Sequence, residues 1–308
     1  MVNQDLNSTP KWLIVIAYSL VVVIWSTTPI TIKWSSEGVG HLFGVSLRMA
    51  LGAIVSMLLV LVYYRKFPVN KIACKAYTAS ALALYGGMLP VYWGAQYISS
   101  GLVSVIFGLS PIITGYLAWR FIHEQSFSPV KLFGAMAGVV GLLFIFFEDS
   151  QTLDGYIYGV FAVLLAVVLH AISVVWVKSI KIDMPPLTLV AGGLLFSMPL
   201  FMITYIIYAP PFPEYIPVKA MWSIIYLGVV GSVIGFVCFY YLLRHLATST
   251  VALITLITPV VALWIGYMFN GESISANIYA GTLFVLLGLG LHQWGDAISK
   301  RLCKKLNT

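Results

Sequence analysis

Residues 97–124 read YISSGLVSVIFGLSPIITGYLAWRFIHE, and residues 245–272 read HLATSTVALITLITPVVALWIGYMFNGE. The second segment repeats the pattern of the first at an offset of 148 positions. Identical residues pair across that offset: Gly87 with Gly235, Tyr92 with Tyr240, Pro111 with Pro259, Phe121 with Phe269 and Glu124 with Glu272. After one residue of slippage, Gly134 and Gly141 meet Gly281 and Gly288. The chain is therefore a duplicated unit, which inside apolar sequence is typical of transporters.

The composition indicates a membrane protein, because hydrophobic residues make up 60% of the chain and charged residues only 9%. A soluble domain carries about a quarter charged residues. Apolar stretches recur that are long enough to cross about 30 Å of hydrocarbon as a helix. We therefore expect an all-α integral membrane protein with ten transmembrane helices. The expected spans are 12–33, 41–63, 73–97, 100–121, 130–147, 156–177, 187–208, 219–243, 249–269 and 276–295.

The ten spans divide into two five-helix repeats, 12–147 and 156–295, with short cytoplasmic tails expected at 1–11 and 296–308. Because five is an odd number, the second repeat must enter the membrane from the opposite side. Inverted repeats of this kind are related by a pseudo-twofold axis in the membrane plane. The sequence thus predicts one central cavity, between the repeats, that opens to either side in turn.

The distribution of basic residues predicts the orientation. With both termini inside, fourteen of the seventeen Lys and Arg residues fall in inside segments, and the acidic residues of 148–154 fall outside. The exceptions are Lys33, Lys219 and Arg48. We expect a multi-pass protein of the cell inner (plasma) membrane with cytoplasmic termini. The net charge of +7 follows from this topology and, being split among short loops, does not indicate nucleic-acid binding.

Motifs of enzymes and of metal or cofactor sites are absent from the sequence. Cys74, Cys238 and Cys303 form no disulfide framework or Cys–His metal spacing, and no nucleotide loop or catalytic serine motif occurs. An intramembrane enzyme would need a cluster of deep histidines and carboxylates. We expect no catalytic residue, no metal and no cofactor, and hence a protein that is not an enzyme.

Three features together resemble the EamA-type transporters of the drug/metabolite transporter superfamily. They are a Trp-Ser element in span one, Arg48 within SLRMALGA of span two, and two copies of P-x12-E followed by G-x6-G. The resemblance covers 12–295. It implies ten helices in two inverted repeats, with spans one, three, four, six, eight and nine around a cavity and spans five and ten packed at the side. It also implies transport of amino acids, sugars, nucleotide derivatives or other small metabolites. Span seven, LTLVAGGLLFSMPLFMI, lacks a counterpart of Arg48.

Pro111 and Pro259 each follow a hydroxyl residue, Ser110 and Thr258. Proline removes a backbone donor and bends a helix, and the freed carbonyls can face a water-filled cavity. We interpret the prolines as hinges and the two hydroxyls as substrate-binding residues. A static kink that serves packing is the alternative.

Tyrosines at membrane depth are further substrate-binding candidates: Tyr85 and Tyr92 in span three and Tyr240 in span eight. Tyr85 and Tyr92 are seven residues apart and so share a helical face. A tyrosine belt at the membrane interface is the alternative for Tyr92 and Tyr240. Tyr85 lies nearer the middle of its span and is the better candidate for the cavity.

Trp25 and His170 occupy comparable places, since WSTTPITIK (25–33) and HAISVVWVK (170–178) align at an offset of 145. His170 lies roughly 20 Å inside its span at 1.5 Å per residue. An ionisable group at that depth often marks the transport path; a neutral histidine bonded to a backbone carbonyl is the alternative. Arg48 lies roughly 10 Å inside its span. Its side chain can snorkel to water, pair with the acidic loop 148–154 or bind an anionic group. We favour a structural role, in which Arg48 links parts of the protein. Trp25, His170 and Arg48 complete the predicted substrate-binding set.

Glu124 and Glu272 end their helices and are interpreted as caps of neighbouring helix N-termini rather than as groups of substrate chemistry. Lys33 and Lys178, at span ends, are expected to snorkel. No carboxylate lies in mid-span, where ion-coupled carriers commonly place one. We therefore expect facilitated transport, or weak coupling through His170.

Glycines in span five (134, 138 and 141) and span ten (281, 288 and 290) predict close packing of these helices within one monomer. A weak homodimer through the Gly134-x-x-x-Gly138 face is the alternative.

The sequence as a whole favours an alternating-access transporter, an exporter or facilitative carrier, for a small polar or amphipathic metabolite such as an amino acid. Its expected partners are this small-molecule substrate and the lipid bilayer. A lipid-carrier translocase, a regulatory subunit and a gated channel remain open as alternatives.

Overall fold

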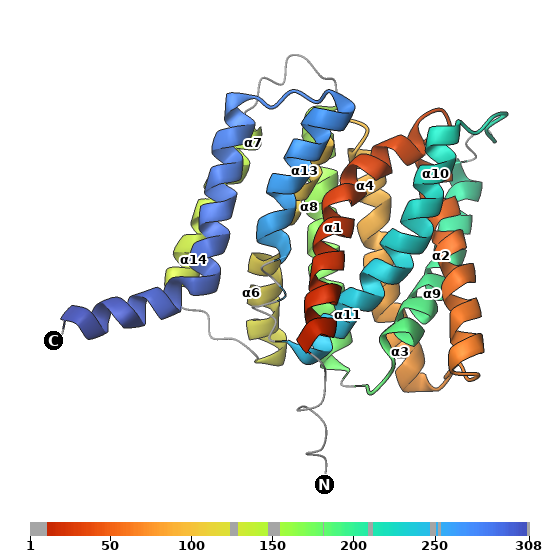
Figure 1. Cartoon of the computed structure of the whole chain (residues 1–308), viewed down its shortest axis with the longest axis horizontal. Helices are drawn as coiled ribbons and strands as arrows, with labels where there is room; N and C mark the ends of the chain where they lie inside the picture. Colours follow the sequence, from red (N-terminus) through yellow and green to blue (C-terminus); the bar gives the residue numbers. More distant parts are fainter. Residues whose placement is uncertain are drawn as a thin grey trace, which may run out of the picture.

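The computed structural model describes residues 11–123, 129–146, 155–180, 182–208, 212–246, 251 and 254–306. These residues form ten helical rods that stand side by side (Figure 1), which confirms the all-helical, ten-span prediction. In the first half the rods are α1 (Lys11–Ser36), α2 (His41–Tyr63), α3 (Lys71–Ala81) with η1 (Leu82–Gly87) and α4 (Met88–Gly94), α5 (Ser100–Phe107) with α6 (Ser110–Ile122), and α7 (Pro129–Phe146). In the second half they are α8 (Tyr156–Ser179), α9 (Pro186–Tyr208), α10 (Val218–Tyr226) with η3 (Leu227–Ile234) and α11 (Gly235–His245), α13 (Ile254–Asn270), and α14 (Ala276–Leu306).

Six of the described segments are by themselves long and apolar enough to cross a membrane. They are Lys11–Ser36, His41–Tyr63, Ser100–Ile122, Tyr156–Ser179, Pro186–Tyr208 and Val218–His245. Most of them are only partly buried, although every residue of 100–106 in α5 is buried. In α2, for example, Val45, Met49 and Val60 are buried, whereas Ile54 and Leu58 are exposed as a surface for lipid.

The two halves enter the bundle from opposite ends. Lys33, in the last turn of α1, and Tyr156, the first residue of α8, line the same hollow. The first helix of the second half therefore begins where the first helix of the first half ends, as an inverted pair requires. This end is called the Glu272 end below, and the opposite end, where α1 begins, is called the Lys11 end.

The third and eighth rods each contain a π-helical segment, η1 and η3. Gly87 is the last residue of η1, and its repeat mate Gly235 directly follows η3. A π turn widens the helix by one residue and commonly marks functional sites. Nothing in the hydrophobic periodicity predicts these segments, although the duplicated glycines lie at their ends.

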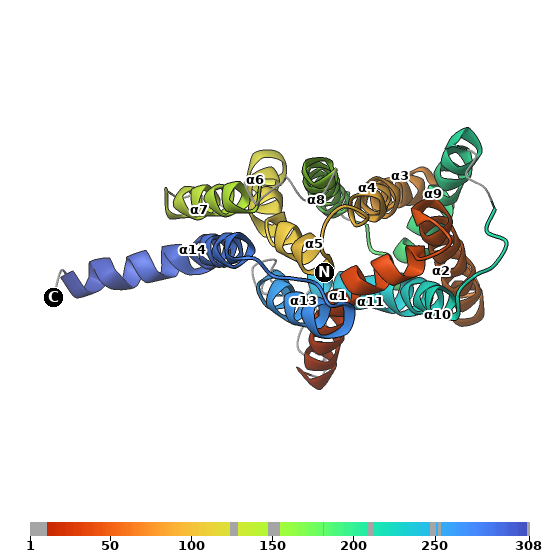
Figure 2. The same cartoon turned by 90° about the horizontal axis from the view of Figure 1, so that it is seen from above.

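Helices α7 and α14 pack along one another and stand to one side of the other rods, as both views show (Figures 1 and 2). Their glycines permit this contact. A Cβ atom at Gly141 would lie 2.6 Å from the carbonyl oxygen of Gly281, and one at Gly288 would collide with the backbone of Gly134 and Gly138. The predicted close packing within a monomer is confirmed, and the Gly134-x-x-x-Gly138 face is occupied by α14. Gly290, by contrast, meets only Trp294.

We expect Gly141→Val to weaken the α7–α14 contact, because the added side chain needs backbone displacement that typically costs about 1–3 kcal/mol. Gly290→Val is the matched control, since a Cβ there is 3.9 Å from the nearest atoms. Thermal unfolding of both variants in detergent measures the difference. Equal melting temperatures would contradict the contact.

Candidate functional site

A small central cavity of about 90 Å³ lies between the two halves. Five of the eight predicted substrate-binding residues line it: Trp25, Arg48, Ser110, His170 and Thr258. They come from α1, α2, α6, α8 and α13, so the cavity draws on both repeats. Trp25 and His170, the residues that align between the repeats, face the same space.

The cavity wall combines hydroxyl groups with aromatic and other apolar surface. Thr28, Ser104 and Thr255 add to the hydroxyls of Ser110 and Thr258, while Phe107, Phe236 and Met88 add apolar surface to Trp25. The Trp25 ring lies 4.8 Å from that of Phe239 and 6.4 Å from that of Phe236, between centroids. Such a wall suits a small amphipathic solute.

His170 is buried, with 7% of its surface exposed, and its Nδ1 has no hydrogen-bond partner. The rings of Phe107 and Phe239 lie 6.2 Å and 6.3 Å from the imidazole, between centroids. Nδ1 therefore makes no bond to a backbone carbonyl. Because Nδ1 is itself buried, a solute or a water molecule can bond to it only when the cavity widens.

Arg48 is 1% exposed and lines the cavity, so it does not snorkel. Its Nε donates to Ser232 Oγ of η3 over 3.0 Å, and its guanidinium carbon lies 5.9 Å from the centre of the Tyr92 ring. Nη1 is buried without a partner. The acidic loop 148–154, one of the partners considered for Arg48, lies outside the described residues.

The three predicted tyrosines do not line this cavity, contrary to expectation. Each hydroxyl pairs with a hydroxyl of another rod: Tyr85 with Thr204 at 2.6 Å, Tyr92 with Ser35 at 3.1 Å and Tyr240 with Ser80 at 3.4 Å. Tyr92 and Tyr240 are buried, so a lipid-facing belt does not explain them either. The tyrosines link rods instead.

The two prolines differ in their local structure. Pro111 lies in the first turn of α6, after a break between α5 and α6, whereas Pro259 lies inside α13. A Cβ placed on Gly108, in that break, would lie 3.7 Å from Cγ of Pro259. The break in one repeat thus lies close to the kink in the other, and their hinge roles remain a prediction.

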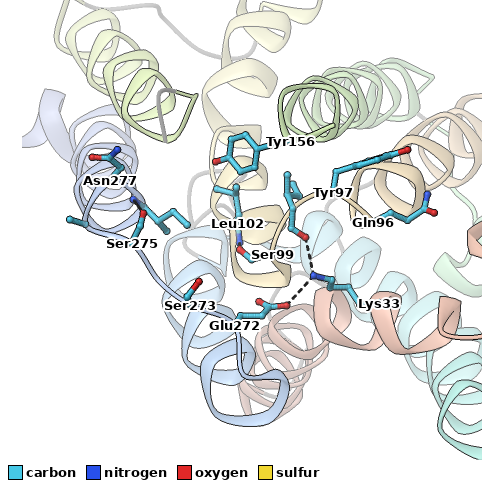
Figure 3. A pocket seen from close by; sticks show the side chains of 13 residues that line it. Lys33, Gln96, Tyr97, Ser99, Leu102, Tyr156, Glu272, Ser273, Ser275 and Asn277 are labelled. Atoms are coloured by element: carbon cyan, nitrogen blue, oxygen red, sulfur yellow. Dashed lines mark hydrogen bonds and ion pairs between the residues drawn. The ribbon is translucent and has the colours of Figure 1, made fainter. Parts of the chain in front are cut away.

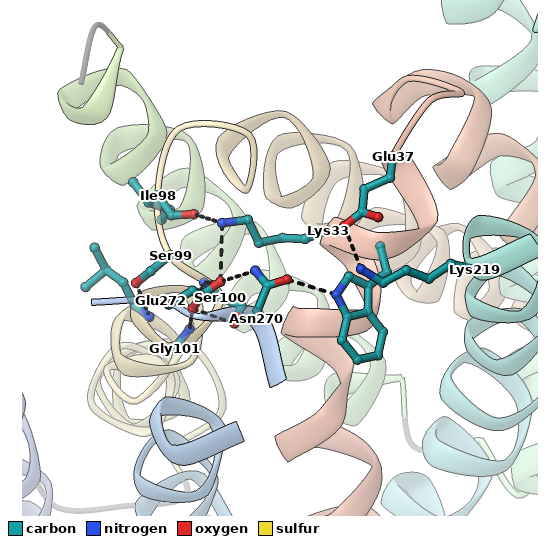
Figure 4. Close-up of polar contacts among 11 residues, drawn as sticks. Lys33, Glu37, Ile98, Ser99, Ser100, Gly101, Lys219, Asn270 and Glu272 are labelled. Carbon is teal, nitrogen blue, oxygen red and sulfur yellow. Dashed lines mark hydrogen bonds and ion pairs between the residues drawn. The ribbon is translucent and has the colours of Figure 1, made fainter. Parts of the chain in front are cut away.

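Glu272 caps α5 at one end of the bundle, as interpreted from the sequence. Its carboxylate accepts bonds from the Ser100 N–H at 2.9 Å and from the Ser100 hydroxyl at 2.8 Å (Figure 4). The Lys33 ammonium lies 3.3 Å from this carboxylate and donates to the Ile98 carbonyl over 3.0 Å. We call this arrangement of Lys33, Glu272 and the N-terminus of α5 the Glu272 lock. It joins α1 and α5 of the first half to the α13–α14 connection of the second.

The lock holds Glu272 ionised. Burial alone raises the pKa of this carboxyl, but the Ser100 N–H, the Lys33 ammonium, the Ser100 hydroxyl and the Asn270 amide together bring it below the ordinary value of 4.5. Asn270 in turn accepts a bond from the Trp34 indole over 3.0 Å. Sequence reasoning placed Lys33 at the interface as a snorkelling side chain and missed this partner. The repeated P-x12-E motif was the available signal. Glu124, the mate of Glu272, lies outside the described residues.

A hollow of about 520 Å³ opens beside the lock at the Glu272 end (Figure 3). Polar side chains gather around it, among them Gln96, Ser99, Ser275 and Asn277. A second hollow, of about 220 Å³, lies at the Lys11 end beside Tyr240 and the exposed Arg244–Asp183 ion pair. Among the described residues, no group of three His, Cys, Asp or Glu side chains is arranged to hold a metal ion.

Comparison with known proteins gives a consistent result. The model of the EamA-like transporter family matches twice, at residues 12–147 and 157–292. The uncharacterized transporter YoaV of Bacillus subtilis is 26% identical over 87% of this chain and 92% of its own, and an uncharacterized transporter of Archaeoglobus fulgidus is 27% identical over 91% and 97%. Protein PagO of Salmonella typhimurium is 23% identical over 90% and 91%. A solved crystal structure superposes with a TM-score of 0.63 at 15% identity, over 90% of this chain and 96% of that one, which is a likeness of fold.

We expect Glu272→Gln to lower the free energy of unfolding near neutral pH by about 2 kcal/mol, because charge-assisted hydrogen bonds are lost. The carboxylate's contribution is present above the ordinary pKa of 4.5 and is lost as pH falls through the lower pKa of the folded state. Thermal unfolding from pH 7 to pH 3 should therefore show a steeper loss for the wild type than for Glu272→Gln. Glu37→Gln, which breaks the exposed pair with Lys219, is the control. Parallel pH profiles for the wild type and Glu272→Gln would contradict the lock.

Proposed function

Because this chain belongs to the EamA-like transporter family and is a multi-pass membrane transporter, not an enzyme, we propose that it carries a small amphipathic metabolite, such as an amino acid, by alternating access. The single observation that carries this proposal is the central cavity, which lies between the repeats with Trp25 and His170 on its wall. Substrate sites of inverted-repeat carriers lie at such an interface.

The cavity's size supports a cycle of movement. Its 90 Å³ is well below the roughly 300–1,000 Å³ of ordinary ligand pockets. A metabolite therefore fits only when the rods around the cavity move apart. A carrier that alternates between a contracted and an opened cavity meets this requirement, whereas an open pore does not.

The Glu272 lock supplies a candidate gate. Since it ties α1 and α5 to the second half, the Glu272 end can open only after Lys33 and Glu272 separate. The proposed topology, with both termini in the cytoplasm, places this gate on the outer side of the cell membrane. Pro111 and Pro259, near the contact of the two halves, are the proposed hinges.

Coupling of solute transport to a proton or sodium gradient is proposed to be absent or weak. No Asp or Glu is among the described residues that line the cavity, and His170 supplies the one imidazole there. We therefore propose facilitative exchange or export along the solute gradient. In that scheme the substrate-binding set consists of Trp25, Ser110, His170, Thr258 and Arg48.

Transport is tested with the purified protein in proteoliposomes, using labelled amino acids first ranked by thermal stabilisation of the wild type. We expect saturable uptake that internal unlabelled solute accelerates. Trp25→Ala should lower uptake at least tenfold because it removes a wall of the cavity. Trp222→Ala, at a tryptophan that is 62% exposed, is the matched control and should transport normally. Non-saturable flux, or equal loss in both variants, would contradict the proposal.

Gate opening is tested by chemical access to the cavity. In a background without native cysteines, Thr28→Cys places a thiol on the cavity wall. We expect a membrane-impermeant maleimide to label it several-fold faster when Glu272→Gln weakens the lock. Glu37→Gln breaks the ion pair with Lys219 just after α1, at the same end of the bundle, and should not change the rate. Equal labelling rates with and without Glu272→Gln would exclude the lock as a gate.

A further inference from the structure

Arg48 presents a buried positive charge to the central cavity. It is 1% exposed, lies on the cavity wall and has one nitrogen, Nη1, without any partner. A guanidinium group stays protonated in proteins. A buried charge of this kind destabilises the protein unless it is paired, and inside a membrane it commonly marks a functional site.

The groups that face Arg48 do not neutralise it. Ser232 of η3 accepts one hydrogen bond from Nε, and the Tyr92 ring of α4 lies 5.9 Å away. Gly231 leaves space beside Nη2, since a Cβ atom there would lie 3.4 Å from this nitrogen. None of the carboxylates in the described part of the chain lies within 4 Å of the guanidinium. Glu272, Glu37 and Asp183 are paired with Lys33, Lys219 and Arg244.

The geometry points to Arg48 as the residue that binds a carboxylate group of the transported solute. This inference rests on the proposed function. Arginine presents a planar fork of N–H donors that matches the two oxygens of a carboxylate. Nε is held by Ser232, which leaves the Nη side of the fork for a ligand in the cavity.

The rest of the cavity limits the solute to one negative charge. Arg48 is the only residue with a permanent charge among the described cavity-lining residues, and span seven carries no second arginine. Trp25, Phe107 and Phe236 form apolar wall. No carboxylate lines the cavity to select an ammonium group, although hydroxyls such as Ser110 and Thr258 can accept hydrogen bonds from one. The inferred substrate class is thus the amphipathic monocarboxylates, which include apolar amino acids.

The test compares a carboxylate with its uncharged carboxamide. L-leucine and L-phenylalanine, each with its carboxamide, are titrated against the purified full-length protein, with stabilisation read by thermal shift. The wild type should bind at least one of the two amino acids and prefer it to its amide roughly 10- to 100-fold, the range expected for hydrogen bonds to a charged group. Arg48→Gln should lose this preference while its affinity for the amide changes little. Arg48→Lys should retain part of the preference.

Fold integrity is controlled in two ways. Ser232→Ala leaves the charge in place but removes its tie, and should reduce the preference without abolishing it. If Arg48→Gln does not purify as a folded protein, Arg48→Lys and Ser232→Ala are compared with the wild type instead. An unchanged preference for the carboxylate in both variants overturns the inference.

The outcomes separate this inference from the proposed function. Two outcomes overturn the role of Arg48: a preference for carboxylate that persists in Arg48→Gln, and equal binding of acids and amides by the wild type. Neither outcome contradicts the proposed transport function. If the wild type in proteoliposomes shows no saturable uptake of any solute tested, the transport proposal itself is overturned. Retained uptake together with a lost carboxylate preference in Arg48→Gln supports both.

Discussion

The structure depends on one constraint, which is that a polar group within hydrocarbon must find a partner inside the protein. Within helices the backbone groups form hydrogen bonds with one another. Side-chain hydroxyls form hydrogen bonds between rods, as Tyr85 does with Thr204 and Tyr92 with Ser35. Among the described residues, five buried side-chain atoms lack a partner, and three of them, in Ser26, Tyr205 and Thr282, belong to residues that do not line the central cavity. Nη1 of Arg48 and Nδ1 of His170 both belong to residues on the wall of the central cavity, where a solute can complete their bonding.

Duplication explains why the cavity lies where it does. Two five-rod halves of opposite orientation meet along a shared interface, and each contributes a broken or kinked rod next to it. The break before Pro111 and the kink at Pro259 lie close to each other across that interface. By contrast, α7 and α14 pack against each other through glycines at the side of the other rods.

Much of this fold could be predicted from the sequence, because composition, span length and the duplicated P-x12-E pattern each depend on local sequence. Which side of each rod faces the cavity could not be predicted. The prediction that Tyr85 and Tyr92 share a cavity-facing side assumed a regular α-helix, whereas Tyr85 lies in the π segment η1 and Tyr92 in α4. A π turn adds a residue and rotates all that follows it, so seven-residue spacing no longer marks one face. The P-x12-E motif marked Glu272, but its pairing with Lys33 could not be predicted, because the two residues are 239 positions apart and meet only in the tertiary fold.

The two halves share a fold but not their charges. Span seven has no arginine that corresponds to Arg48. The positive charge of the cavity therefore lies on α2 alone, and apolar rings form other walls. Under the inference for Arg48, a solute with a single carboxylate orients with that group toward α2. Since Arg48 is anchored to Ser232 of η3, in the other half, any movement that separates the halves also changes the geometry of the anion site. In the proposed cycle, this one hydrogen bond links binding of the carboxylate to opening of the cavity.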